Sequence, residues 1–206
     1  LFEAPSSHGT DDDAAFAGAL RRYRDRVALG VQVLSGRGPV ASMSLLDLTP
    51  ALQPADQSLN RGLLNGSPDP DGVIRRRPGH SAAEMRQHLG SSVPDGLAKT
   101  LLELANADIN LDDKLLDLLD PYGPPGTIPT ISIWELLDAN AFLTIKKSGV
   151  LTDAMVLVGP TAAVFQDLHP AVFSGAQGMP GVELHATEVA NRLEDLSLIH
   201  ISEPTR

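Results

Sequence analysis

The chain contains no cysteine among its 206 residues, which excludes disulfide bonds, thiolate catalysis and Cys-ligated metal sites. Aromatic residues make up only 4%, and the longest nearly uninterrupted apolar stretch, 154–165, is broken by Gly159 and Pro160. A transmembrane helix needs about 20 apolar residues, so this stretch is too short to form one. Basic residues are few, since 16 Lys and Arg face 26 Asp and Glu for a net charge of −10. This balance disfavours binding to nucleic acid or anionic lipid.

Both ends of the sequence are unusual. No initiator methionine or signal peptide is visible, and apolar Leu1 and Phe2 lead directly into a polar loop, as if the chain began at the end of a strand. The last eleven residues, LSLIHISEPTR at 196–206, resemble the in-frame translation of a sequencing-library adapter. Foreign sequence takes no part in fold reasoning. We therefore predict one domain over 1–195 and a non-native tail over 196–206.

The first half of the chain alternates helical and strand-like patterns. Acidic residues followed by apolar residues at helical spacing predict a helix over 12–25, and the run 27–34 predicts a strand. The Gly-, Pro- and Ser-rich segment 35–59 is typical of a long surface excursion. Two short strands, 61–65 and 72–76, flank the turn-forming residues GSPDPD, so we expect a hairpin there.

The second half continues the alternation. Leucines at helical spacing predict a helix over 93–105, with Ser92 as its cap, while 115–123 fits either a helix or a strand. Ser132 and Glu135 form a capping-box pattern that predicts a short helix through Ala139. The run 154–159 predicts a strand buried on both faces. A final helix is predicted by an apolar stripe, Val182, Ala186, Val189 and Leu193.

Helices interleaved with apolar strands favour an α/β fold, in which a mixed, mostly parallel sheet is covered by helices. Four ordered blocks then resemble one known family: DPDGVIRR at 69–76, YGPPGTIPTISIWELLD at 122–138, LTDAMVLVGPTAAVFQD at 151–167 and MPGVELHATEVANRL at 179–193. Each block alone is weak, but their order and spacing together are fairly specific. The chain resembles the extracellular sensory CHASE domains of the second type over essentially 1–195.

The resemblance implies a non-catalytic sensory input module of a bacterial membrane receptor, facing the periplasm or the exterior. It implies that a first strand and helix, a membrane anchor, transmembrane helices and a cytoplasmic output domain lie outside this sequence. The output domain would be a cyclase, a diguanylate cyclase, a histidine kinase or a Ser/Thr kinase. The implied partners are a small-molecule or envelope stimulus and a second copy in a homodimer, with no nucleic acid. Since no dimerisation motif is visible, we expect a monomer or a weak dimer.

A stimulus site is predicted where the loop after Val158 meets the start of the last helix. In open α/β sheets, ligands favour the crevice beyond the carboxyl ends of strands. The predicted ligand-binding residues are Gly159, Thr161, Asp167, Gly181 and His185. A helix N-terminus favours an anionic or hydroxyl-rich ligand. The alternative is structural: Asp167 would cap backbone N–H groups and His185 would bond to a neighbouring strand or loop.

No cofactor or metal site is predicted. His185 and Glu188 can meet at i, i+3, but two ligands do not make a zinc site. Asp69 and Asp71 resemble half of a calcium loop, yet arginines 75–77 occupy the following positions, so a turn and a charged strand edge are expected. Gly159 alone is no dinucleotide fingerprint and no serine lies in G-x-S-x-G. The rival functions are a soluble α/β enzyme or nucleotide-binding domain using the loop after Val158, and an envelope protein that only mediates protein contacts.

Overall fold

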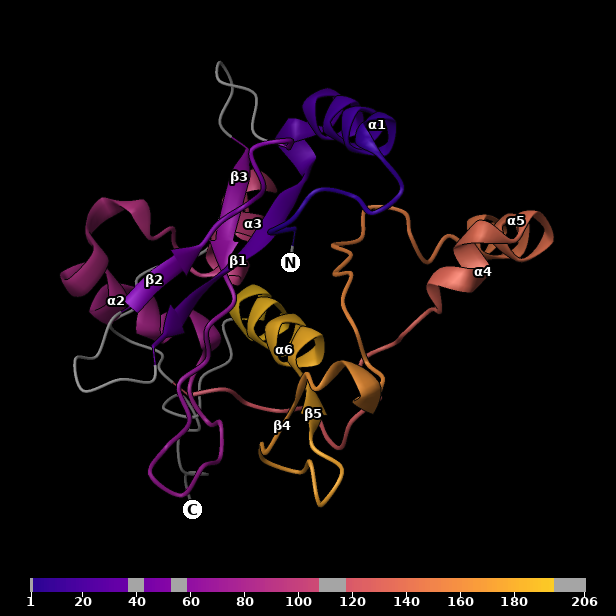
Figure 1. Ribbon diagram of the computed structural model, residues 1–206. Coiled ribbons are helices and arrows are strands. Elements are labelled where there is room, and N and C mark those ends of the chain that lie inside the picture. The colour runs from indigo at the N-terminus through magenta and orange to yellow at the C-terminus, as the bar shows by residue number, and fades with distance from the viewer. Residues whose placement is uncertain (1, 37–42, 53–58, 108–117, 195–206) are drawn as a thin grey trace.

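The computed structural model describes residues 2–36, 43–52, 59–107 and 118–194 and has an α/β architecture (Figure 1). Strand β1 (Ala28–Ser35) lies at the centre of a three-stranded sheet, in the order β2-β1-β3. It pairs antiparallel with β2 (Met43–Leu46) and parallel with β3 (Asn60–Leu63). The predicted α/β class and mixed sheet are therefore confirmed, with one pairing of each kind.

The N-terminal helix covers part of this sheet, because alternate residues of β1 are apolar and point the same way. Helix α1 (Thr10–Arg22) contributes Ala17 and Leu20 to a core cluster with Leu29 and Val31 of β1. Three acidic residues occupy its first turn and two arginines its last, which suits the helix dipole. The predicted helix over 12–25 and strand over 27–34 are confirmed within a few residues. A short 3₁₀ turn (Arg24–Arg26) joins them.

Two further helices lie beside the sheet. Helix α2 (Ala82–Leu89) stands between 3₁₀ turns at Pro78–Ser81 and Gly90–Ser92, and it has no counterpart among the predicted elements. Helix α3 (Leu97–Leu104) packs on β3 so tightly that a methyl group on Gly62 would lie 2.5 Å from the Cα of Leu97. The predicted helix over 93–105 is thus present but begins later, after Gly96 and not after Ser92.

The C-terminal half adds a two-stranded ribbon and three helices. The ribbon pairs β4 (Leu168–His169) with β5 (Met179–Pro180), after a 3₁₀ turn at Ala163–Phe165. The chain then enters α6 (Gly181–Leu193), which confirms the predicted last helix. Val189 of α6 packs against Ala98 and Leu102 of α3, so α6 is part of the body of the domain.

Residues 121–158 form an extended arm. Its tip is formed by helices α4 (Ile133–Leu137) and α5 (Ala139–Ser148), which stand away from the rest of the chain (Figure 1). A first connection, 121–132, leads to the tip, and a second connection, 149–158, returns from it. The predicted capping box is present, since Ser132 and Glu135 bond reciprocally at the start of α4. The helix predicted to run through Ala139 ends at Leu137, and a second helix, α5, follows directly. The Asp138 carboxylate caps this second helix by accepting hydrogen bonds from two backbone amides.

The predicted surface excursion over 35–59 is wrong for its described part. This segment supplies the edge strand β2, and Leu48 and Leu52 are buried in the α1 cluster. Glycine, proline and serine gave it the composition of a loop. The 4 residues of β2 nevertheless join the sheet, and the two leucines join the core between α1 and β1.

The predicted hairpin between 61–65 and 72–76 is also wrong. The turn itself forms, since Asp69 N donates to Val73 O at 3.0 Å and Gly72 N donates to Asp69 O at 2.8 Å. The two flanking runs nevertheless find other partners. The first pairs with β1, while Ile74 bridges to Ala171 and Arg76 bridges to Leu118. A turn motif determines where the chain reverses direction, whereas the burial of side chains determines which strands pair.

The predicted buried strand over 154–159 is wrong. This segment has no secondary structure and forms part of the second connection of the arm, where Val158 is 80% exposed. An apolar run supplies strand propensity, but a strand also needs a neighbour with free backbone groups. Of the undecided segment 115–123, the structure describes 118–123, which is neither a helix nor a regular strand. Leu118 makes an isolated bridge, and the N–H of buried Leu119 donates to Arg75 O at 2.8 Å.

Candidate functional site

The first turn of α6 lies directly under the aspartate that the sequence singled out. The backbone N–H of Gly181 donates to the carbonyl of Asp167 at 3.0 Å. A methyl group on Gly181 would lie 2.6 Å from Asp167 Oδ1, so a larger residue at this position would require the Asp167 carboxylate to move. The same carboxylate oxygen lies 2.9 Å from His169 Nε2. A carboxylate at a helix N-terminus is favoured by the helix dipole.

The loop after Val158 also reaches the start of α6. A methyl group on Gly159 would lie 2.7 Å from the Cβ of Val182, which makes the contact as close as that of Gly181 with Asp167. Gly159, Asp167 and Gly181 are therefore brought to one helix turn. Thr161 is exposed and forms no hydrogen bond with the residues that the structure describes.

His185 belongs to the interior instead. It is 6% exposed, and its Nδ1 has no hydrogen-bond partner among the described residues. Burial lowers the pKa of His185, while the charge of Glu188 and the backbone of Leu64 oppose this shift. Burial thus favours the neutral form of the side chain, which lies next to Leu64 at the end of β3.

The buried face of α6 is polar, which the sequence analysis missed. Glu188 and Arg192 form an ion pair at 3.1 Å with side chains 1% and 3% exposed. The Asn191 amide bonds both to the backbone N–H and to the carbonyl of Asp120 at 2.9 Å. The i, i+4 spacing of Glu188 and Arg192 was the available signal. It was hidden because exposed helices carry such pairs far more often than buried ones.

The predicted apolar stripe of α6 faces a groove. Ala186, Val189 and Leu193 line it, and Leu193 is 47% exposed. The opposite walls are the two connections of the arm, and the volume is about 550 Å³. The lining residues are Tyr122, Thr127, Ile128, Pro129, Asp153, Met155, Leu157, Ala186, Val189, Ala190 and Leu193. The stripe therefore borders a largely apolar surface opening, and its Val189 also packs against α3.

Glu183 ties the arm to the helix. Its carboxylate accepts hydrogen bonds from the backbone N–H of Gly126, at 2.9 and 3.0 Å, and of Ile128, at 3.4 Å. At the other end of the groove, Tyr122 donates to Glu194 at 2.9 Å, and burial followed by this carboxylate raises the pKa of Tyr122. Hydrogen bonds thus join the first connection to the helix at its first turn and at its C-terminal end.

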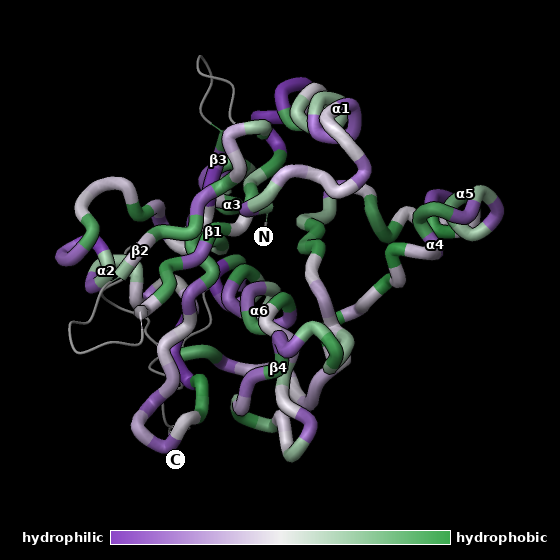
Figure 2. Tube along the Cα trace, viewed as in Figure 1, coloured by the Kyte–Doolittle hydropathy of each residue, from purple (hydrophilic) through white to green (hydrophobic). Residues whose placement is uncertain are grey.

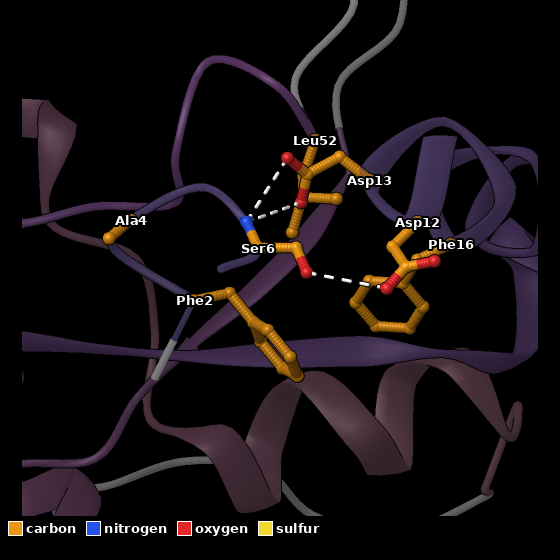
Figure 3. A pocket seen from close by; sticks show the side chains of 7 residues that line it. All are labelled: Phe2, Ala4, Ser6, Asp12, Asp13, Phe16 and Leu52. Atoms are coloured by element: carbon orange, nitrogen blue, oxygen red, sulfur yellow. Dashed lines mark hydrogen bonds between the residues drawn. The ribbon is translucent and has the colours of Figure 1, made fainter. Parts of the chain in front are cut away.

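A second, smaller pocket of about 280 Å³ lies beside α1 (Figure 3). Its apolar part is formed by the rings of Phe2 and Phe16, whose centroids are 5.0 Å apart, together with Leu52. Its carboxylates are already engaged, since Ser6 N donates to Asp13 at 3.0 and 3.1 Å and Ser6 Oγ to Asp12 at 3.5 Å. These hydrogen bonds hold the N-terminal loop against α1.

The DPDG segment forms a turn, as expected, and its aspartates also pair with the arginines that follow, which was not predicted. Asp71 bonds Arg75 at 2.7 Å, and Asp69 bonds both Arg75 and Arg76. These bonds lower the pKa of Asp71 to about 2, the hydrogen bond from Arg75 being the main cause. The predicted charged strand edge is wrong for Arg77, which is 2% exposed. Within the described ranges, no group of three His, Cys, Asp or Glu side chains is arranged to hold a metal.

Comparison with known proteins gives one match. The family model described as the CHASE2 domain matches residues 1–205. No curated protein and no solved structure matches the chain. Among the described residues, no helix is long and apolar enough to cross a membrane. Because the family model covers nearly the whole sequence, the chain belongs to the CHASE2 domain family, the extracellular sensory domains of signalling receptors.

Proposed function

We propose that this chain is the extracytoplasmic sensory input module of a bacterial transmembrane receptor and is not itself an enzyme. The match to the CHASE2 family over 1–205 is the observation that carries the proposal. In the full-length protein, transmembrane helices would connect the domain to a cytoplasmic cyclase, diguanylate cyclase, histidine kinase or Ser/Thr kinase. A stimulus would act by binding two arrangements of the domain unequally.

The stimulus site we propose is the junction of Gly159, Thr161 and Asp167 with the start of α6 at Gly181. Two close contacts support it, because Gly159 lies against the Val182 side chain and Gly181 lies against the Asp167 carboxylate. Asp167 already places a carboxylate over the first turn of α6, which disfavours an anionic ligand. A ligand whose hydroxyl groups donate hydrogen bonds to the Asp167 carboxylate fits this site better. His185 would influence the site from the interior of the domain, since it is buried one turn further along α6.

The complete reading frame of the source gene tests the receptor assignment. We expect a hydrophobic segment of about 20 residues upstream of the domain and several downstream, followed by one of the four output domains. A continuous reading frame with no such segments, or one joined to catalytic motifs of a soluble enzyme, would refute the receptor function.

Substitutions in the full-length receptor test the site. Thr161→Ala with Asp167→Asn should abolish the response of the output domain to its stimulus while the isolated domain keeps its thermal midpoint. Asp25→Asn is the matched control, because Asp25 is 90% exposed and distant in sequence from both residues. Loss of folding would assign Thr161 and Asp167 a structural role, and an unchanged response would place the site elsewhere.

A further inference from the structure

The imidazole of His185 is buried in the domain without a full set of hydrogen bonds. Figure 2 shows hydrophilic stretches within α6, although this helix packs in the body of the domain. His185 is 6% exposed, and its Nδ1 has no hydrogen-bond partner in the part of the chain that the structure describes. A neutral ring keeps one nitrogen as an acceptor, whereas a protonated ring carries a donor proton on both nitrogens. A second proton on His185 would therefore bury a charge together with an unsatisfied donor, which costs free energy.

The charges around His185 offset this cost only in part. Glu188, on α6 itself, favours the charged ring, but its carboxylate already pairs with Arg192 at 3.1 Å. Asp167 also favours the charged ring, while His169 opposes it. The elements that pack on α6 carry Lys99 and Glu103 of α3, His80 of the 3₁₀ turn Pro78–Ser81, and Arg77 just before that turn. Burial has the largest influence, and the pKa of His185 is lowered.

Acidification therefore favours any rearrangement that brings His185 into water. A histidine in water has an ordinary pKa of about 6.5. Below that pH, an open arrangement binds a proton that the closed arrangement does not, because the pKa of His185 is lower when the side chain is buried. Each pH unit below about 6.5 then shifts the balance toward the open arrangement by up to about tenfold. The shift ends once the pH falls below the pKa of the closed arrangement.

The first turn of α6, which precedes His185, has weaker attachments than the turns that follow it. The helix begins without a side-chain cap, and Gly181 N donates to Asp167 O at 3.0 Å. Glu183 adds hydrogen bonds to the first connection of the arm, and these are exposed to water. The later turns are held in the interior, where Val189 packs on α3 and Asn191 is fully buried. Local opening starts at such weakly held ends of an element.

Leu184 keeps this turn closed at neutral pH. It is buried in a cluster with Ile74, Leu119 and Met179. Opening of the first turn exposes this apolar side chain to water, which costs free energy. The charge on His185, the next residue along the helix, has the opposite effect. The balance between the two neighbours makes the arrangement of the turn depend on pH.

We propose that the first turn of α6 is a proton switch: acidification charges His185, and the turn then separates from Asp167 and from the first connection of the arm. The switch regulates the stimulus site proposed above, because the separation removes the contact of Gly181 with Asp167, and its signalling consequence rests on that proposed function. His169 acts in the same direction, since its Nε2 lies 2.9 Å from Asp167 Oδ1. A protonated His169 would hold this carboxylate in an ion pair and withhold it from the hydroxyl groups of a ligand.

NMR spectra of the full chain between about pH 8 and pH 5 test the switch without any substitution. We expect the amide signals of Gly181 and Gly126 to shift together with the ring signals of His185, with one midpoint below about pH 6.5. Amide signals of β1 should not follow that midpoint. Constant Gly181 and Gly126 signals, or a His185 ring that does not titrate in this range, would overturn the proposal. Signals of an unfolded chain that grow with acid, in place of a shift, would overturn it as well.

Histidine variants assign the transition to one residue. His185→Gln removes the group that takes up the proton, so it should abolish the shifts of the Gly181 and Gly126 amides. His8→Gln is the matched control and should keep them, since His8 is an exposed histidine of the N-terminal loop. Shifts that persist in His185→Gln would come from carboxylates and would overturn the proposal. Circular dichroism shows whether His185→Gln is folded, and the titration of the unsubstituted chain decides the question if it is not.

The full-length receptor separates this proposal from the proposed function. With the cytoplasmic side buffered, a change of the outside medium from about pH 7.5 to about pH 5.5 should alter the activity of the output domain about threefold or more. His185→Gln should lose this response, and His8→Gln should keep it. A response that survives His185→Gln would overturn the proton switch. An NMR transition in the domain without any response of the output would leave the switch standing and count against the receptor function.

Discussion

Ionisable side chains inside this domain are concentrated on one helix. Of the four that are buried among the described residues, His185, Glu188 and Arg192 lie on α6, and Arg77 is the fourth. The ion pair of Glu188 with Arg192 offsets the cost of burying both charges. His185 avoids that cost by staying neutral, because burial lowers its pKa. His185 therefore makes the stability of the domain depend on its protonation state.

The free energy of unfolding should fall as the pH falls below the ordinary histidine pKa of about 6.5. The unfolded chain then takes up a proton at His185 that the folded chain does not, because its folded pKa is lowered. His185 thus contributes stability above pH 6.5 that is lost toward acid, by at most about 1.4 kcal/mol per pH unit. Denaturant unfolding of wild type and His185→Gln from pH 8 to 5 measures this. A pH slope equal in the two proteins would contradict it.

Gly62→Ala should destabilise the domain by about 1–3 kcal/mol, because the added methyl group would meet the backbone of Leu97 at 2.5 Å. The backbone of α3 cannot move aside as a flexible side chain would. Gly18→Ala is the control, since Gly18 lies in the interior of α1 with its nearest neighbour at 3.9 Å. It should stabilise the chain by about 0.5–1 kcal/mol. Chemical denaturation of both variants should therefore give shifts of opposite sign.

At the scale of elements, caps and close contacts decide where helices begin. The reciprocal bonds of Ser132 and Glu135 start α4, and the Asp138 carboxylate starts α5 immediately afterwards. Helix α3 instead begins after Gly96 with no side-chain cap. The nearby Asp95 pairs with Arg86 and Lys99: burial would raise its pKa, yet these two cations lower it overall.

Asp138→Ala should loosen α5 by about 1 kcal/mol, because two backbone amides lose their acceptor. The effect should be local, since the principal neighbour of α5 is α4. Hydrogen exchange of the α5 amides should become faster, while exchange in β1 stays unchanged. Asp138→Asn keeps an acceptor oxygen and should behave like wild type. Equal acceleration throughout the sheet would show that the arm is part of the cooperative core.

At the scale of the whole molecule, local signals were sufficient for helices and insufficient for pairing. The last helix, the first helix and the capping box were all predicted because their signals lie within a few residues. The pairing of β3 with β1 was not predicted, because it joins residues about 32 positions apart in the sequence. The run 154–159 was predicted as a strand, since an apolar sequence does not reveal whether a neighbouring strand is present. Of the residues predicted for the site, Gly159, Asp167 and Gly181 lie together at the start of α6, whereas the buried polar residues of α6 were missed.

Removal of 196–206 should leave the thermal midpoint of the domain nearly unchanged, because we predict that this tail did not evolve with it. The residues lie outside those that the structure describes, although the family model extends to residue 205. Differential scanning calorimetry of the full and shortened chains provides the measurement. A loss of more than about 1 kcal/mol would show that the tail is native structure.

The carboxylate of Glu183 makes the arm and α6 one mechanical unit. It holds the Gly126 and Ile128 amides of the first connection from the first turn of the helix, next to Gly181. The hydrogen bond of Tyr122 with Glu194 provides a second attachment, at the other end of the helix. A displacement of the arm would therefore be transmitted through Glu183 to the first turn of α6, which also contacts Asp167. A protein that binds the arm could in this way act on the proposed stimulus site without touching it.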